Sequence, residues 1–284
     1  TMNETPYPTI TRFPIPPRST AEKLKSHIHQ VIDFGTTQED QKISHVLEQL
    51  TQKPLPKGKL LQSSLRFVLS HFPQKFRDKH FNNYFANAPI PDDNTQLEVI
   101  GEGGVNKVFA ISLDSQSPSI AIGISKKDFE SKDEAFTFAE HQQQEHDLIA
   151  SFFQHIPNVI PDEQYAIFQG PRQKYNVMHF QNFVEGPIRD FFDMPAQELQ
   201  ALIQSNPQFN DQLKKFAQTC HEHSDFFIQS QIDFLGPKNL AIIGKEGREQ
   251  LLFLDPHFRL SDHTPDKEQE ISNRIDYLST VANL

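Results

Sequence analysis

Short runs rich in apolar, β-branched and aromatic residues lie in the middle of the chain, and such runs predict β-strands. The strands are expected at residues 97–101, 108–112, 120–124, 165–168 and 175–180. Between the third and the fourth of them, residues 128–153 carry apolar side chains at helical spacing and predict a helix. Residues 97–185 are therefore expected to form a small antiparallel sheet with this one helix packed on it.

The chain before the sheet differs, because its apolar residues follow helical spacing. Residues 1–18 contain five Pro and are expected to be extended. Residues 19–95 are predicted to form an all-α region. Its first helix opens with a capping box at residues 19–22 and carries Val31 and Ile32 on its apolar face. The other helices are expected to begin at a second capping box at residues 37–40, near residue 58 and after Pro73.

Residues 183–284 are predicted to be mostly helical, with one β-hairpin among the helices. The helices are expected from residue 195, over residues 208–224 and after residue 264. Two apolar runs at 240–243 and 251–254 are separated by a glycine-containing turn and predict the two strands of the hairpin.

Composition limits the classes of partner and the cellular compartment that we expect for this protein. A net charge of −10 offers no basic field to neutralise phosphates, so neither nucleic acid nor an anionic membrane is expected as the main partner. No apolar run approaches the roughly 20 residues of a membrane-spanning helix, and no apolar secretory signal is expected at the start. The single Cys220 fits a reducing compartment. We therefore expect a cytoplasmic protein, in its own cell or in a host cell if it is a secreted effector.

A glycine-rich turn lies between the first two predicted strands. Three of its four residues, 101–104, are Gly, which lets the backbone approach a ligand closely with its amides pointing inward. A phosphate is one ligand that suits such a turn. The alternative is an ordinary hairpin, since Gly favours hairpin turns in any case.

The residues around this turn resemble protein kinases. The run G-E-G-G-V-N-K-V-F resembles the kinase glycine-rich loop, with Asn106 in place of the third Gly. The next strand, I-A-I-G, resembles the kinase V-A-I-K, but Gly123 stands at the lysine position. The resemblance implies a nucleotide bound by Gly101, Gly103, Gly104, Val108 and Ala121.

Three polar residues later in the chain match kinase positions that serve catalysis and metal binding. Residues 231–243 resemble the catalytic loop H-R-D-L-x-x-x-N and the strand after it, which implies that Asp233 is catalytic. Asn239 and Asp255 are the implied Mg²⁺ ligands, and their amide and carboxylate oxygens would meet at one end of the hairpin. The sequence departs from the family by one inserted residue between Asp233 and Asn239, and by D-P-H, starting at Asp255, in place of D-F-G.

Further positions follow from the same resemblance. Glu145 matches the helix glutamate that pairs with the strand lysine in kinases, although a solvated helix glutamate is the alternative. Asn182 and Val184 match the hinge and would offer backbone groups to an adenine. Because the strand lysine is missing, another cation is expected at the nucleotide phosphates. The candidates are Lys107, Lys126 and Lys127.

The resemblance, over about residues 97–260, implies the fold class α+β. It implies a protein-kinase-like two-lobed fold, with a sheet lobe at 96–182 and a reduced, mostly helical second lobe at 183–284, preceded by the all-α N-terminal region. The implied activity is an ATP- and Mg²⁺-dependent phosphotransferase whose acceptor is a small molecule or a protein hydroxyl. A pseudokinase that binds nucleotide or a partner protein is the first alternative, favoured by Gly123. The second is a helical interaction protein without nucleotide, which would bind its partner through the N-terminal helices.

Overall fold

A computed structural model describes residues 30–51, 71, 75, 96–102, 106–112, 119–170, 173–183, 186–244, 247–258 and 264–283. The chain divides into two compact units. The sheet unit comprises Ile28–Gln144 and Asp162–Glu185, and the helical unit includes Glu145–Pro161 and Gly186–Leu284.

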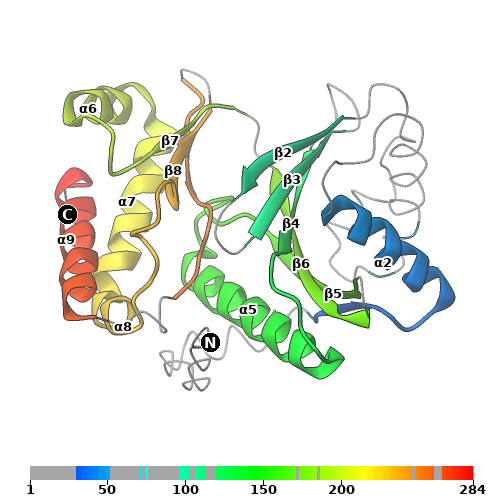
Figure 1. The fold of residues 1–284 in the computed structure, drawn as a ribbon. Coiled ribbons are helices and arrows are strands. Elements are labelled where there is room, and N and C mark those ends of the chain that lie inside the picture. Colours follow the sequence, from blue (N-terminus) through cyan, green and yellow to red (C-terminus); the bar gives the residue numbers. More distant parts are fainter. Residues whose placement is uncertain are drawn as a thin grey trace, which may run out of the picture. The chain divides into compact units, whose positions relative to one another are not determined.

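A six-stranded sheet forms the centre of the sheet unit (Figure 1). Its strands lie in the spatial order β1-β5-β6-β4-β3-β2. Their bounds are β1 Ile32–Phe34, β2 Gln96–Glu102, β3 Asn106–Ser112, β4 Ser119–Ser125, β5 Glu163–Gln169 and β6 Tyr175–Phe183. All neighbours from β5 to β2 pair antiparallel, which confirms the arrangement predicted for residues 97–185. Only β1 pairs in parallel, with β5, so the sheet as a whole is mixed.

Helix α5 (Lys132–Phe153) confirms the predicted helix, although it begins four residues later than expected. It packs small residues against the sheet: Ala135 and Ala139 are buried in one cluster with Ile167 and Val177 of β5 and β6. Because the Ala side chains are short, the helix axis can lie close to the strands. The first part of α5 belongs to the sheet unit, and the residues from Glu145 onward belong to the helical unit.

A strand stands where the sequence predicted only helix. Residues Ile32–Phe34 form β1 and pair in register with residues 166–168 of β5, so the prediction of an all-α region at 19–95 is wrong at this point. Ile32 and Phe34 are buried and Asp33 between them is half-buried, which is the alternation of a strand. β-branched residues such as Ile32 suit a strand, and the edge of β5 supplies the pairing partner that the local pattern could not reveal.

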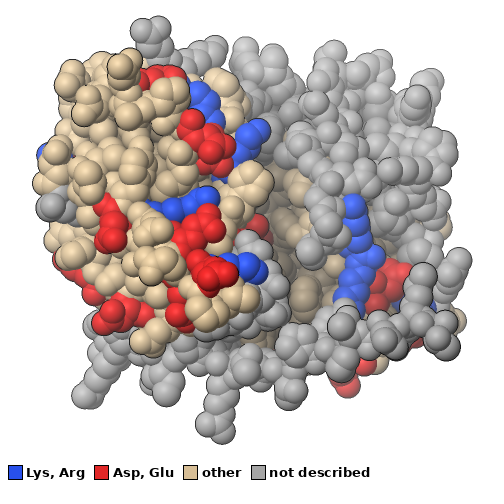
Figure 2. Space-filling model, turned by 60° about the vertical axis from the view of Figure 1, so that its left-hand side comes forward, with Lys and Arg blue, Asp and Glu red and all other residues tan. Residues whose placement is uncertain are grey.

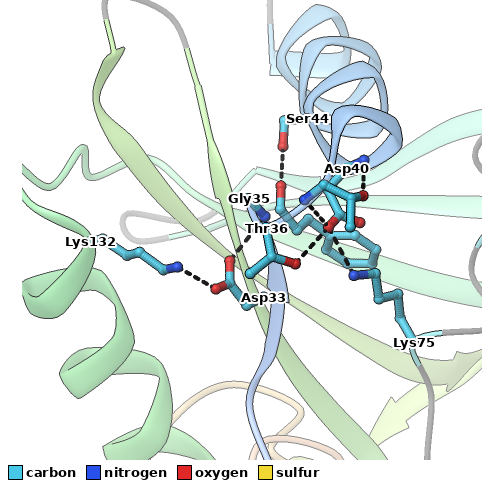
Figure 3. Close-up of polar contacts among 9 residues, drawn as sticks. Asp33, Gly35, Thr36, Asp40, Ser44, Lys75 and Lys132 are labelled. Atoms are coloured by element: carbon cyan, nitrogen blue, oxygen red, sulfur yellow. Dashed lines mark hydrogen bonds and ion pairs between the residues drawn. The ribbon is translucent and has the colours of Figure 1, made fainter.

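Helix α2 (Gln38–Thr51) begins with the predicted capping box. Thr37 Oγ1 accepts a hydrogen bond from the Asp40 amide at 3.1 Å, and Asp40 Oδ2 accepts one from the Thr37 amide at 2.9 Å. Figure 3 shows that Ser44, one turn further, donates its hydroxyl to the Phe34 carbonyl, at 2.7 Å. The Ser44 bond fastens α2 to the end of β1.

The helical unit combines a small sheet, in the order β7-β8-β9, with a group of helices (Figure 1). Its elements are β7 Ile188–Asp190, α6 Ala196–Ser205, α7 Pro207–Glu222, α8 Ser224–Gln229, β8 Leu240–Ile243, β9 Gln250–Phe253 and α9 Pro265–Val281. The predicted hairpin and the three predicted helices are confirmed, whereas β7 and the short α8 were not expected from the sequence. Thr264 caps α9 by accepting a bond from the Lys267 amide.

Phenylalanine side chains form much of the core of the helical unit. Phe153 of α5 stacks on Phe216 of α7 with ring centroids 4.6 Å apart, and Phe234 and Phe253 pack next to them. All four rings are fully buried. Burial of each such ring stabilises the fold by roughly 1.5–3 kcal/mol. The cluster therefore holds α5, α7 and the hairpin firmly together, which fixes the loops at the hairpin's end.

Several predictions lie outside the described residues. They concern the extended segment at 1–18, most of the helices expected at 58–72 and after Pro73, and the positions of Gly103, Gly104 and Val184. Within the part of the chain that the structure covers, no helix is long and apolar enough to cross a membrane.

Candidate functional site

The hairpin β8–β9 brings two of the predicted polar residues to the same end of a strand pair. Leu240 lies opposite Phe253 in the register, and the Leu254 amide donates to the Asn239 carbonyl at 2.7 Å, which extends the ladder by one step. Asn239 comes just before β8 and Asp255 shortly after β9. The two residues therefore lie at the same end of the hairpin, because antiparallel pairing places the start of β8 beside the end of β9.

A second pairing brings Asp233 to this end of the hairpin. Ile232 forms an antiparallel bridge with Phe258, and the Asp233 amide donates to the His257 carbonyl at 2.7 Å. From the other side, Asn239 Nδ2 donates to the Asp233 carbonyl at 2.9 Å. Asp233, Asn239 and the segment that carries Asp255 are thus joined by hydrogen bonds within the helical unit.

The inserted residue is accommodated inside the loop and does not separate Asp233 from Asn239. Asp233 Oδ1 accepts bonds from the amides of Leu235 and Gly236, both at 3.1 Å, and the Asn239 amide donates to the Gly236 carbonyl at 3.1 Å. A Cβ at Gly236 would stand 2.4 Å from Asn239 Nδ2, so a side chain here would push Asn239 away. Lys238 takes a positive φ of 64°, which lets the chain turn back into β8.

Helix α9 supports this loop from outside. The Arg274 guanidinium donates to the Phe234 carbonyl, pairs with Glu270 at 3.2 Å and lies 4.5 Å from the centre of the Phe192 ring. The contacts with Glu270 and Phe192 already orient the planar guanidinium, so it loses little conformational freedom when it binds the Phe234 carbonyl of the loop. The backbone next to Asp233 is therefore anchored by a side chain distant in sequence.

His257 and Glu145 lie next to Asp255. His257 Nε2 is 2.9 Å from Asp255 Oδ1, and its Nδ1 is 4.0 Å from Glu145 Oε2. Glu145 also accepts a hydrogen bond from the Phe258 amide. The helix glutamate of the predicted site therefore faces the D-P-H segment. The sequence analysis missed the role of His257, and the only signal was its unusual place after Asp255-Pro256.

Burial governs the ionisation of Glu145. The side chain is 5% exposed, and this desolvation raises the pKa of the carboxyl above the ordinary value for glutamate. The positive charge of His257 and the bond from the Phe258 amide act in the opposite direction, while the nearby Asp255 raises the pKa further. The net effect is a raised pKa, because the charged form of this carboxyl is unfavourable in its buried position.

The donor set fits a magnesium ion that shares its coordination with a phosphate ligand. Asn239 uses its Nδ2 on the Asp233 carbonyl, which leaves an amide oxygen as the metal-binding atom, and Asp255 has a carboxylate whose side chain is 54% exposed. Mg²⁺ is commonly held by one or two such oxygens together with substrate phosphates. No group of three or more His, Cys, Asp and Glu side chains among the described residues is arranged as a complete metal site.

Several of the residues predicted to bind a nucleotide lie directly opposite one another on neighbouring strands of the sheet unit. Gly101 lies opposite Val108, Val108 lies opposite Gly123, and Ala121 lies opposite Gln181. Directly opposite residues face the same side of a sheet, so Val108, Ala121 and Gly123 share one face. Asn182 lies opposite Ile120 in the backbone register, next to the described end of β6.

The candidate lysines have different positions. Lys107 lies opposite Ile124, in the row next to that of Gly123. Lys127 lies beyond the end of β4, so it is not part of the row of strand residues that contains Gly123. Its Nζ stands 4.6 Å from the centre of the Phe129 ring, as a cation–π pair. Lys126 is exposed.

Charged side chains of both signs are intermixed on the molecular face in Figure 2, where Lys and Arg side chains lie beside Asp and Glu side chains of the described residues. Two of the acidic groups on the helical unit, Glu198 and Glu249, pair with Arg189 at 2.7 and 3.9 Å. Such mixed surfaces attract neither polyanions nor polycations over long range.

Comparison with known proteins does not assign the chain to a family. No model of a protein family matches the chain, and a search of the curated proteins found no similar sequence. The geometry of the two units is therefore the basis on which a function can be inferred.

Proposed function

We propose that this protein is a kinase-like phosphotransferase that uses ATP and Mg²⁺ and transfers a phosphoryl group to a hydroxyl of a small molecule or a protein. The observation that carries the proposal is that hydrogen bonds join Asp233, Asn239 and the segment that carries Asp255 at one end of the hairpin.

Each of these residues has a distinct role in the proposal. Asp233 orients the acceptor hydroxyl and takes up its proton. Asn239 and Asp255 hold Mg²⁺, which when bound neutralises the charge of the phosphates. Arg274 keeps the Asp233 loop in place through the Phe234 carbonyl.

The sheet unit supports the same proposal independently. The strand order β2-β3-β4-β6-β5, antiparallel throughout and with α5 inserted after β4, agrees with the small lobe that the kinase resemblance implies. The glycine-rich turn follows β2 in this order, where the resemblance expects the nucleotide phosphates. In the proposal, Gly101, Gly103, Gly104, Val108 and Ala121 contact the nucleotide, with hinge groups from Asn182 and Val184.

A pseudokinase is the second candidate, and one observation favours it. Asp255 pairs with His257 at 2.9 Å, so the proposed metal ligand is already engaged by an imidazole. A protein that binds nucleotide without transfer could keep this pair unbroken. The two candidates differ in turnover and not in nucleotide binding.

Transfer of labelled phosphate from ATP, to the chain itself or to a panel of metabolites, separates the candidates. Asp233→Asn should keep nucleotide binding and lower the transfer rate by about 10²–10⁴, because the amide oxygen can still accept the bonds from Leu235 and Gly236 while the proton acceptor for the hydroxyl is lost. The control is Asp276→Asn, an exposed carboxylate on α9, which should transfer like the wild type. Equal transfer by the wild type and Asp233→Asn would exclude Asp233 from the reaction. ATP binding without transfer in any variant would establish the pseudokinase.

A further inference from the structure

The space left by the missing strand lysine is occupied by a histidine. His179 of β6 lies directly opposite Gly123 of β4 in the register. A Cβ built on Gly123 would stand 2.1 Å from His179 Cε1 and 2.2 Å from its Nε2, closer than two such atoms can approach. The imidazole therefore fills the space where a side chain at position 123 would begin, and with His179 in this place only glycine fits opposite it.

Glu163 of β5 lies beside this ring and forms an ion pair with it when the ring is protonated. Its Oε1 lies 3.7 Å from His179 Nδ1. The Glu163 side chain is buried, at 5% exposure, whereas that of His179 is 16% exposed. The imidazole is therefore the more accessible of the two groups. Gln143 of α5 donates to the Glu163 carbonyl at 3.1 Å and holds this part of β5 in position. Both Cε1 and Nε2 of the ring lie on the side of Gly123. With Nδ1–H facing the carboxylate, Nε2 carries the second N–H in the protonated ring.

The imidazole shares a row of the sheet with the glycine-rich turn. Gly101, Val108, Gly123 and His179 lie opposite one another in succession across β2, β3, β4 and β6. Neighbouring strands are about 4.8 Å apart, so a ligand of the length of a triphosphate can extend along this row. The two glycines leave the row without side chains at their positions, and His179 Nε2 lies next to Gly123.

We propose that His179, next to Glu163, contacts the phosphate oxygens of a nucleoside triphosphate in place of the missing lysine. This inference rests on the proposed nucleotide-dependent function. In the protonated ring, Nδ1–H faces Glu163 while Nε2–H donates to a phosphate oxygen, so the bond to phosphate is charge-assisted. The lysine candidates are placed less well, since Lys127 stacks on Phe129 and Lys107 lies in a different row.

Isothermal titration with Mg·ATP tests the proposal. His179→Gln should bind Mg·ATP about tenfold to a hundredfold more weakly than the wild type, as expected for the loss of a charge-assisted hydrogen bond. The matched control is His45→Gln, an exposed histidine on α2 of the same unit, which should bind like the wild type. The double variant Gly123→Lys with His179→Ala returns an ammonium group to the vacated space and should bind more tightly than His179→Ala alone.

The outcomes separate this inference from the function on which it rests. If His179→Gln binds Mg·ATP as tightly as the wild type, the role of His179 is refuted and the phosphotransferase proposal stands. If the wild type itself does not bind Mg·ATP at millimolar concentration, both are refuted. Thermal unfolding verifies that each variant is folded. Should His179→Gln not fold, the double variant decides, because binding no tighter than that of His179→Ala would overturn the inference.

Discussion

At the scale of the residue, Glu145 carries the largest electrostatic cost in the proposed site. Its carboxyl is buried, and its pKa is raised chiefly by desolvation, even though His257 and the Phe258 amide favour the charged form. Folding therefore gains from this group below the pKa of an unfolded glutamate, and the gain is lost as the pH rises through the raised value in the folded protein. A residue kept at such a cost is typical of a functional site.

Glu145→Gln should therefore stabilise the protein at neutral pH. The amide oxygen of Gln can still accept the bond from the Phe258 amide, while the cost of a buried charge disappears. We expect a rise in the thermal midpoint of a few degrees at pH 7.5, at about 2–4 °C per kcal/mol, and little difference from the wild type below about pH 4. Glu140→Gln, an exposed position on the same helix, should leave the midpoint unchanged. A lower midpoint for Glu145→Gln at pH 7.5 would show that the carboxylate stabilises the fold.

At the scale of the element, the start of α2 is held by one buried carboxylate. Asp40 Oδ2 accepts from the Thr37 amide and from the Thr36 hydroxyl, both at 2.9 Å, and from Lys75 Nζ at 2.8 Å (Figure 3). These bonds lower the pKa of Asp40, although burial alone would raise it. The carboxylate therefore closes the capping box and also ties Lys75, distant in sequence, to the helix.

Asp40→Ala should lower the free energy of unfolding by about 1–3 kcal/mol, because it removes the cap and leaves a lysine without its carboxylate. Glu39→Ala, the neighbouring exposed acidic residue, should cost at most a few tenths of a kcal/mol. Urea titration followed by circular dichroism measures both. Equal stability of the two variants would mean that the cap does not hold α2 in place.

The same element shows where sequence patterns were sufficient and where they were not. The capping box at residues 37–40 is a local signal, and it located the start of α2 correctly. The strand β1 was missed because Ile32 fits the helical spacing of the residues before it as well as the alternation of Ile32, Asp33 and Phe34. The choice between them is made by pairing with β5, far along the chain, which no local pattern contains.

At the scale of the whole molecule, the regular elements were predictable and the contacts between them were not. Antiparallel hairpins and long helices carry their period in the sequence, so β2 to β6, α5 and the β8–β9 hairpin were placed correctly. The order of motifs also predicted that Asn239 and Asp255 lie at one end of the hairpin, and the backbone pairing places them there, while their roles stay a prediction. His179 and His257 were missed, since their positions depend on partners in other strands or helices, Glu163 and Glu145 respectively.

The central claim is that Asp255 takes part in binding Mg·ATP, and a thermal midpoint measured with and without Mg·ATP tests it most directly. A ligand that binds only the folded state stabilises it by mass action, by about 2.7 kcal/mol at a hundredfold excess over Kd. We predict a rise of about 5–10 °C for the wild type that requires Mg²⁺, and loss of most of this Mg²⁺-dependent rise in Asp255→Ala. Asp276→Ala should respond like the wild type. An unchanged midpoint of the wild type at millimolar Mg·ATP would contradict the account.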